Sequence, residues 1–440
     1  MDNTMKKWFF CLSTILVLFI VGCKEDEPTI VPVPQQPTYK LTDFTPSLQC
    51  QPCHPQYYDE WSGSMHPYST SDPIWRLANN SLQAHTNGAL GKACFQCHSP
   101  IGWLTDTYKP SFEFSDLDPL VREGINCDFC HVLRPPFKTT NQQIEYTLQP
   151  GNIKYGTLSN PVANAAHENG FEPAYDRSEA CRQCHDLILN GVPFEITFTE
   201  WQNSPWGAMS VECQKCHMQT YTGQAAVGGP VRNDLHRHTF AGADVAITDF
   251  PNRLEQKAEI DSFMKNSASL KLDVPTQANL PDSVPVHVTI CNDKTGHNLP
   301  TSVFFNRQMW IEVTVWKGTD TVYRSGHLDA NGDLMDKNSA LRPNEDIDLA
   351  LFNGTLYKDG HETGILVELD SVFNNTIPPF GSRKATYKFK ATVTGNWNVK
   401  SRLLFRPFGP HLFRALNANE YVTELPIFEM EVDEKIIQIQ

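Results

Sequence analysis

Five times in this 440-residue chain, two cysteines separated by two residues are followed directly by a histidine. Two thiols about one helical turn apart can form thioethers with the two vinyl groups on one porphyrin edge, and the adjoining imidazole can bind the iron. Cys-x-x-Cys-His is therefore the attachment signature of c-type haem. One copy could be a redox dithiol or half of a zinc site, but five copies favour five covalently bound haems c. Motifs 1 to 5, in chain order, comprise Cys50, Cys53 and His54; Cys94, Cys97 and His98; Cys127, Cys130 and His131; Cys181, Cys184 and His185; and Cys213, Cys216 and His217.

The other cysteines do not form a disulfide framework. The chain has 13 cysteines, and the motifs use all but Cys11, Cys23 and Cys291. Cys11 lies in a segment that we expect to be removed, and Cys23 is the predicted lipidation site described below. Cys291 is interpreted as a small buried residue on a strand.

Six further histidines are candidate distal ligands of the irons. Each iron needs a sixth ligand or keeps an open position, and ten of the 15 histidines are not proximal. If residues 54–66 formed one helix, it would be about 18 Å long, so His66 would reach a neighbouring haem and not the iron of His54. In His236-Arg237-His238, alternation on an extended segment would direct only one imidazole inward. His297 could instead be a hydrogen-bonded turn residue. The candidates are His66, His85, His167, His236, His238 and His297.

The first residues resemble a bacterial lipoprotein signal. Lys6 and Lys7 precede an apolar run at 8–21, which is shorter than the roughly 20 residues of a membrane span. The run ends in Gly22-Cys23, as in a lipobox. We therefore expect residues 1–22 to be a cleaved signal peptide and Cys23 to carry the lipid anchor, with an ordinary signal as the alternative. Residues 23–40 then form a proline-rich tether. The charged stretch at 24–27 resembles an acidic export tag to the cell surface of the outer membrane, with the periplasmic face of that membrane as the alternative location.

Composition divides the rest of the chain into two domains and a linker. Residues 41–244 contain all five motifs and few long periodic runs, as expected where porphyrins fill the core. Residues 245–282 are predicted to contain a linker helix. From 283 to 440, apolar residues alternate, for example at Val284, Val286, Val288 and Ile290, and turn residues separate the runs. The predicted fold class is α+β multidomain: a haem-packed, mainly α or irregular pentahaem domain followed by an immunoglobulin-like β-sandwich.

The charge of the chain limits its partners. The formal net charge is −14, and loss of residues 1–22 would leave −15. This acidity disfavours nucleic acid as a partner. Other redox proteins, such as basic periplasmic or surface cytochromes, or an extracellular electron donor or acceptor, fit better.

A repeated phrase carries a family resemblance. Glu60-Trp61-x-x-Ser follows motif 1, and Glu200-Trp201-x-x-Ser follows motif 4. The pattern Cys-x-x-Cys-His-x-x-Tyr-x-x-x-Trp-x-x-Ser-x-His at 50–66 resembles the multihaem cytochrome c-554 family, which is related to hydroxylamine-oxidoreductase-type cytochromes. The segments 124–131 and 211–218 are also similar to that family. The resemblance implies closely packed haems with mostly bis-histidine ligation. This chain departs by having five motifs and by carrying Trp206 at the position that corresponds to His66.

These observations favour electron transfer through a chain of five haems at the outer membrane. The alternative is a haem oxidoreductase in which one open iron acts on a small nitrogen or sulfur compound. Trp206 favours that alternative, whereas the many candidate distal histidines and the lack of a Cys-x-x-Cys-Lys motif count against it. A filament of haem subunits is a third hypothesis, against which the lipid anchor argues.

Overall fold

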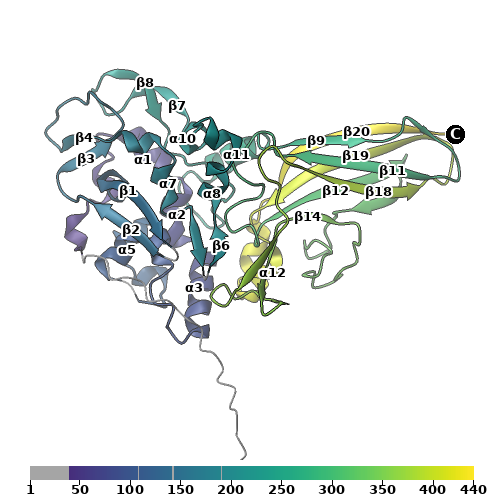
Figure 1. Cartoon of the computed structure of the whole chain (residues 1–440), viewed down its shortest axis with the longest axis horizontal. Coiled ribbons are helices and arrows are strands. Elements are labelled where there is room, and N and C mark those ends of the chain that lie inside the picture. The colour runs from purple at the N-terminus through teal and green to yellow at the C-terminus, as the bar shows by residue number, and fades with distance from the viewer. Residues whose placement is uncertain (1–38, 108, 141–142, 190) are drawn as a thin grey trace, which may run out of the picture.

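The computed structural model describes residues 39–440 except 108, 141–142 and 190. It has a rounded N-terminal lobe and an elongated C-terminal β lobe (Figure 1). The predicted signal peptide, Cys23 and the tether up to residue 38 lie outside the described residues. Within the described part, no helix is both long enough and apolar enough to cross a membrane.

The N-terminal lobe is built from short helices. Prolines at the first helical position begin several of them, as at Pro55 and Pro73, where the missing N–H costs no hydrogen bond. Pro100 and Pro205 begin α5 and α9 in the same way. The helices are α1 (Pro55–Ser62), α2 (Met65–Ser71), α3 (Pro73–His85), α4 (Phe95–His98), α5 (Pro100–Thr105), α6 (Cys127–Val132), α7 (Glu179–Arg182), α8 (Thr197–Gln202), α9 (Pro205–Ala208) and α10 (Cys213–His217).

The N-terminal lobe also contains small two-stranded sheets, which the prediction of a mainly α or irregular domain did not specify. Three of these sheets are antiparallel, and the pair β3–β4 is parallel. They are β1 (Leu133–Thr140) with β2 (Gln143–Leu148), β3 (Ile153–Gly156) with β4 (Glu168–Phe171), β5 (Leu187–Leu189) with β6 (Val192–Glu195), and β7 (Thr220–Gln224) with β8 (Val231–His236). Short 3-10 turns lie at Leu41–Asp43, Ser47–Gln49, Phe114–Asp116, Val121–Glu123 and Pro173–Asp176.

Two sheets enclose the core of the β lobe. One has the strand order β10-β20-β19-β12-β13, with β14 also paired to β12, and the other has the order β18-β11-β9. The strands are β9 (Ser269–Asp273), β10 (Gln277–Ala278), β11 (Ser283–Cys291), β12 (Gln308–Lys317), β13 (Asp320–Ser325), β14 (Ala350–Phe352), β18 (Ser382–Lys390), β19 (Gly395–Arg406) and β20 (Phe428–Ile439). A separate small sheet joins β15 (Gly354–Lys358), β16 (His361–Glu362) and β17 (Ser371–Asn374).

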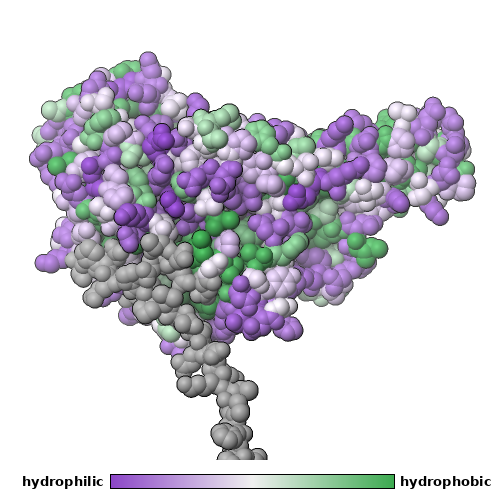
Figure 2. Space-filling view, in the orientation of Figure 1, coloured by the Kyte–Doolittle hydropathy of each residue, from purple (hydrophilic) through white to green (hydrophobic). Residues whose placement is uncertain are grey.

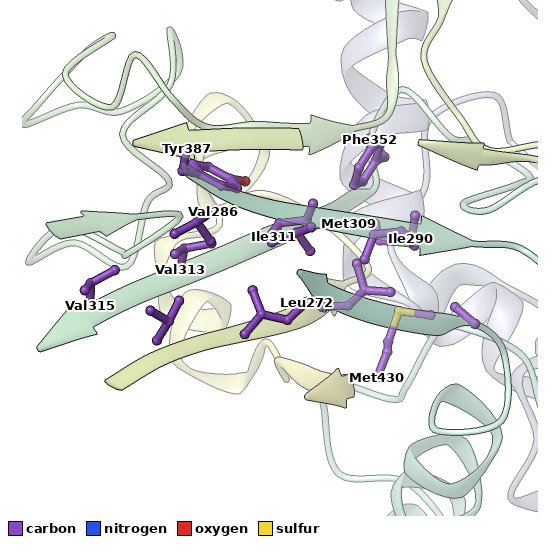
Figure 3. Close-up of a cluster of buried hydrophobic side chains, with 14 of the residues drawn as sticks. Leu272, Val286, Ile290, Met309, Ile311, Val313, Val315, Phe352, Tyr387 and Met430 are labelled. Carbon is purple, nitrogen blue, oxygen red and sulfur yellow. The ribbon is translucent and has the colours of Figure 1, made fainter. Parts of the chain in front are cut away.

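The predicted alternation in the β lobe is confirmed. Val284, Val286, Val288 and Ile290 of β11 are fully buried and face side chains such as Ile311 from the other sheet (Figure 3). Burial of each such side chain contributes about 1.5–3 kcal/mol. The two sheets thus form a sandwich, while an immunoglobulin-like order of its connections stays a prediction.

The linker segment differs from its predicted role. It contains the expected helix, α11 (Arg253–Met264), but Ile260 and Met264 of this helix pack into the core of the β lobe. Residues before 283 also form β9 and β10, and β9 pairs with β11. The β lobe therefore begins earlier than residue 283, because this edge strand was too short to be recognised by alternation.

The two lobes are joined by a buried ion pair. Arg307, whose side chain is 4 % exposed, pairs with Asp244 through its two terminal guanidinium nitrogens, and the contact of Nη2 measures 2.9 Å. Helix α12 (Pro410–Ala415), followed by a 3-10 turn at Asn419–Glu424, packs Phe413 against Ile74 of α3. Figure 2 shows hydrophobic surface gathered in the hollow where the lobes meet.

Candidate haem-binding site

One large cavity contains every motif. Its volume is about 3360 Å³, and its walls include all fifteen cysteines and histidines of the five motifs. Ordinary small-molecule pockets measure about 300–1,000 Å³. Side chains of the β lobe, His297 among them, also line it. A cavity of this size and lining fits several haem groups packed together within one protein shell.

The proximal imidazoles are oriented through one nitrogen. The Nδ1 atom of four of them lies 2.6–3.2 Å from a backbone carbonyl oxygen, so Nδ1 carries the proton and Nε2 is left as the ligand atom. The carbonyls belong to Ala225 for His54, Ser69 for His98, Tyr155 for His131 and Ala241 for His217. The sequence motif cannot show these partners, because they come from distant segments.

Three proximal imidazoles each face a second imidazole. In every pair the two rings are nearly parallel, with interplanar angles of 20–24°. The pairs are His54 with His167 at a centroid distance of 6.2 Å, His131 with His238 at 6.3 Å, and His217 with His297 at 6.3 Å. The structure therefore brings His167, His238 and His297 each to one proximal imidazole.

The pair distances match the space that one metal ion needs. A metal–imidazole bond is about 2.0 Å long, so two nitrogens on opposite sides of one ion are about 4 Å apart. Because each ring centroid lies roughly 1 Å beyond its nitrogen, the centroids of such a pair are about 6 Å apart. Side chains in direct contact would be closer, so these three sites fit an iron between the rings.

His66 lies near His185 of motif 4. Burial and, to a smaller extent, the charge of His185 lower the pKa of His66 to about 3, and its ring packs on Phe240 with centroids 4.3 Å apart. The polypeptide from His54 to His66 is not one helix, since α1 ends at Ser62 and α2 begins at Met65. The expectation that His66 approaches a neighbouring motif nevertheless agrees with this position.

His85 and His236 are not brought to a proximal imidazole. The Nε2 atom of His85 lies 2.6 Å from Glu368 Oε1 of the β lobe. The Nε2 atom of His236 lies 3.1 Å from Asp176 Oδ1, and its Nδ1 atom contacts the Met218 carbonyl oxygen at 2.8 Å. In this structure the Nε2 atom of each therefore contacts a carboxylate and not a site beside a proximal imidazole, and a distal role for either stays a prediction. Of the two histidines in the His236-Arg237-His238 segment, only His238 faces a proximal imidazole.

Motif 2 differs from the others. His98 stacks on Trp75 of α3, with centroids 4.5 Å apart and an interplanar angle of 11°. Burial lowers the pKa of His98 to about 4, and no other imidazole contributes to this shift. In contrast, the neighbouring His297 helps to lower the pKa of His217 to about 4. Among the described residues, no second imidazole is found opposite His98.

Cysteines of different motifs touch inside the cavity. The thiols of Cys50 and Cys127 lie within hydrogen-bonding reach, as do those of Cys97 and Cys184. Cys181 and Cys213 form a third such contact, and Cys130 lies near enough to raise the pKa of Cys181. Because each cysteine would bind a porphyrin edge, these contacts place motif 1 beside 3, motif 3 near 4, and motif 4 beside both 2 and 5.

A set of hydrogen bonds ties motif 1 to motif 3. The Ser47 hydroxyl donates to Glu123 Oε2 at 2.8 Å and accepts from the Cys127 N–H at 3.2 Å. The Trp61 indole donates to the Ile125 carbonyl oxygen at 2.9 Å. Ser47 lies three residues before motif 1, and Ile125 lies two residues before motif 3.

The same arrangement ties motif 4 to motif 5. The Ser178 hydroxyl donates to Glu212 Oε2 at 2.7 Å and accepts from the Cys213 N–H at 2.9 Å. The Trp201 indole donates to the Val211 carbonyl oxygen at 2.7 Å. The Glu-Trp-x-x-Ser repeat therefore belongs to a structural unit of two motifs that occurs twice, once with motifs 1 and 3 and once with motifs 4 and 5. The second copy also contains the β5–β6 hairpin.

Trp206 lies against the β lobe and also lines the cavity. Ser64 caps the helix that carries His66, and Ser204 caps the helix that carries Trp206. The Trp206 ring packs on Phe380 of the β lobe, with centroids 5.7 Å apart. The indole thus closes the second unit against the β lobe, and His98 is the proximal imidazole that lacks a partner among the described residues.

His185 is the one proximal imidazole that faces a carboxylate. Its Nδ1 atom lies 3.8 Å from Glu195 Oε1, and the Glu195 side chain is 8 % exposed. Burial opposes protonation of His185, but hydrogen bonding and charge from Glu195 raise its pKa to about 9. The N–H of Thr197 also donates to Glu195 Oε1 at 3.2 Å.

Comparisons with known proteins agree with these features. Residues 49–132 match the family described as cytochrome c554 and c-prime. The fold is similar to that of a penta-heme cytochrome c552 from Thermochromatium tepidum, with 21 % identity and a TM-score of 0.64, over 90 % of this chain and 99 % of that one. No curated protein matches.

Two further solved structures resemble only part of the chain. A CARDB domain from Pyrococcus furiosus has 8 % identity and a TM-score of 0.18 over 39 % of this chain and 87 % of that one. A beta-glucosidase from Listeria innocua has 12 % identity and a TM-score of 0.17, over 39 % of this chain and 16 % of that one. At these scores neither likeness carries an argument about the β lobe.

Proposed function

We propose that this chain, whose residues 49–132 match the cytochrome c554 and c-prime family, is a multihaem c-type cytochrome that transfers electrons through five covalently bound haems c. Haem c supplies one-electron redox chemistry, and the protein supplies spacing, ligation and electrostatic tuning. The carrying observation is the set of three imidazole pairs at 6.2–6.3 Å within one cavity. Two imidazoles on an iron leave no position for a substrate, so such sites only exchange electrons.

The contacts between motifs define the proposed electron path. Motif 1 lies beside motif 3, motif 3 near motif 4, and motif 4 beside motifs 2 and 5. The imidazoles support the same order, since His54 lowers the pKa of His131 and His185 lowers that of His217. We therefore propose a branched path in which motif 4 is the junction.

The haem count and the ligands can be tested together. A pyridine haemochrome assay with protein quantification should give five haems per chain, and mass spectrometry should find them on the five motifs. Low-temperature EPR of the oxidised protein should then show mainly low-spin iron. Fewer than five haems, or predominantly high-spin iron with motifs 1, 3 and 5 loaded, would refute the proposed assignment.

A second candidate function rests on motif 2. His98 has no imidazole partner among the described residues, so an iron held there would keep an open position for a small ligand. That favours the alternative of an oxidoreductase for a small nitrogen or sulfur compound. Carbon monoxide titration of the reduced protein distinguishes the two: one equivalent per chain indicates one open iron, and none indicates electron transfer alone. His167→Ala is the positive control, since it should add one equivalent.

The location and partners are part of the same proposal. We propose an outer-membrane lipoprotein anchored through Cys23, which exchanges electrons with other redox proteins or an extracellular donor or acceptor. The support is the sequence of residues 1–40 and the net charge of −14. The immunoglobulin-like β-sandwich would serve as a packing and docking module. Globomycin-sensitive processing and loss of membrane association in Cys23→Ala would support the anchor, and unchanged membrane association would refute it.

A further inference from the structure

Glu60 and Glu200 occupy the same position in the duplicated unit. Each precedes the tryptophan whose indole donates to the backbone just before the partner motif. Their carboxylates do not point at an iron-binding residue of their own motif. Instead, each reaches a distant segment of the chain, and in both cases that segment carries a candidate distal histidine.

Glu60 holds the segment of His238. Its Oε2 atom accepts the His238 N–H at 2.7 Å, and its Oε1 atom accepts from Arg237 Nη1 at 2.6 Å. The Glu60 side chain is only 8 % exposed, so the ion pair with Arg237 is shielded from water on one side. Two successive residues of the distal segment are therefore fixed by one carboxylate.

Glu200 holds the segment of His297 in the same way. Its Oε2 atom accepts the Asn298 N–H at 3.1 Å and the Thr301 hydroxyl at 2.5 Å. Both donors are neutral, and both belong to the β lobe. Thr197 reinforces the contact through a hydroxyl pair with Thr301 at 2.9 Å.

The orientation of each distal ring depends on that local backbone. The His238 Nδ1 atom contacts the His236 carbonyl oxygen at 3.0 Å, and the His297 Nδ1 atom contacts the Asn298 carbonyl oxygen at 2.9 Å. Each distal imidazole is therefore hydrogen-bonded to the backbone beside it. Glu60 then joins the backbone of His238 to the unit of motifs 1 and 3, and Glu200 joins the backbone beside His297 to the unit of motifs 4 and 5. His167 differs, because its backbone N–H donates to the neutral amide oxygen of Asn164 at 3.0 Å. Asn164 lies in the same turn as His167.

We propose that Glu60 and Glu200 are positioning residues that hold His238 and His297 opposite the proximal imidazoles of motifs 3 and 5. The inference rests on the ligation proposed above. At position 60 a buried carboxylate is suited to this role because charge-assisted hydrogen bonds to N–H groups are short and roughly twice as strong as neutral ones. At position 200 burial raises the pKa of the carboxyl group to about 8, and the role rests on the Oε2 atom as the acceptor from two neutral donors. Without it, the distal segment keeps its fold but can move away from the iron.

The test compares ligand and positioning variants in the haem-loaded full chain. His238→Ala and His297→Ala define the high-spin EPR signal and the additional carbon monoxide equivalent that result from losing each distal ligand. Glu60→Ala should reproduce a substantial part of the His238→Ala signal. Glu200→Ala should do the same for His297→Ala. Glu255→Ala, at an exposed position of α11, is the control and should leave the spectrum unchanged.

Conservative variants separate positioning from a general effect on folding. Glutamine can accept both neutral donors at position 200, so Glu200→Gln should restore the low-spin signal. At position 60 glutamine loses the ion pair with Arg237, so Glu60→Gln should restore the signal only in part. If the alanine variants fold poorly, these two glutamine variants still test the predicted order.

The possible failures are distinguishable. If His238→Ala and His297→Ala leave the low-spin signals intact, the proposed ligation is wrong, and the positioning role is overturned with it. If those variants become high-spin while Glu60→Ala and Glu200→Ala keep wild-type spectra and carbon monoxide stoichiometry, only the positioning role is overturned. A lower melting temperature with unchanged spectra also overturns it, because that outcome describes a purely structural carboxylate.

Discussion

Replacing Glu195 by glutamine should raise the reduction potential of the haem held by His185. The Oε1 atom of Glu195 lies 3.8 Å from the Nδ1 atom of the His185 imidazole. Adding about 2 Å across the ring and about 2 Å for the metal–nitrogen bond places the charge about 8 Å from the iron. At an effective dielectric constant of about 20, the interaction of unit charges at this distance is about 2 kcal/mol.

The negative charge favours the ferric state, so its removal favours reduction. About 1.4 kcal/mol corresponds to a factor of ten and to about 59 mV for one electron, so about 2 kcal/mol corresponds to roughly 90 mV. Glutamine keeps nearly the same volume and can still accept from Thr197. The expected outcome is therefore an upward shift of one midpoint, while the other midpoints move little.

An EPR-monitored redox titration measures this shift, because individual low-spin signals can be followed as they disappear on reduction. Glu255→Gln, at an exposed position on α11, controls for the general loss of one negative charge. A titration of Glu195→Gln that superimposes on the wild type would refute the reasoning. So would an equal shift of every haem, since a carboxylate beside His185 should act mainly on one iron.

Three further substitutions test the packing around the cavity. Asp244→Ala leaves the buried Arg307 without its partner, and we expect a loss of about 2–3 kcal/mol in the free energy of unfolding, measured by chemical denaturation. His85→Ala removes the contact with Glu368 and should cost at most about 1 kcal/mol without changing the EPR spectrum, because His85 is not opposite a proximal imidazole. Trp61→Phe deletes one indole hydrogen bond and should lower stability by about 1 kcal/mol, read as a shift in melting temperature.

The features that could be predicted from the sequence are those that covalent chemistry or local periodicity determines. Cysteine spacing identifies the haem attachment sites because the porphyrin edge imposes it, and alternation identifies β11 because one face is buried. The sequence could not rank the distal candidates. His85 and His238 look alike in sequence, yet in the structure His85 contacts Glu368, which lies 283 residues away, and His238 faces the imidazole of His131.

The role of the Glu-Trp-x-x-Ser repeat also could not be predicted from the sequence. The Glu-Trp-x-x-Ser repeat was visible, but its meaning depends on Ile125 and Val211, which accept the indole hydrogen bonds. Those carbonyl oxygens carry no side-chain signature. The small strands β3 and β4 were missed for a related reason, because they follow the shape of the cavity and bury few apolar residues.

The position of His297 has a consequence for the order in which the protein matures. Motif 5 ends at residue 217, whereas the imidazole that faces it arrives about eighty residues later, on a loop of the β lobe. Domains tend to fold as units as the chain is made, N-terminal first. Under the proposed ligation, haem attached to motif 5 stays five-coordinate until the β lobe has folded and docked. A chain cut short within that lobe would therefore carry an exposed, reactive iron, and its spectrum would reveal incomplete synthesis.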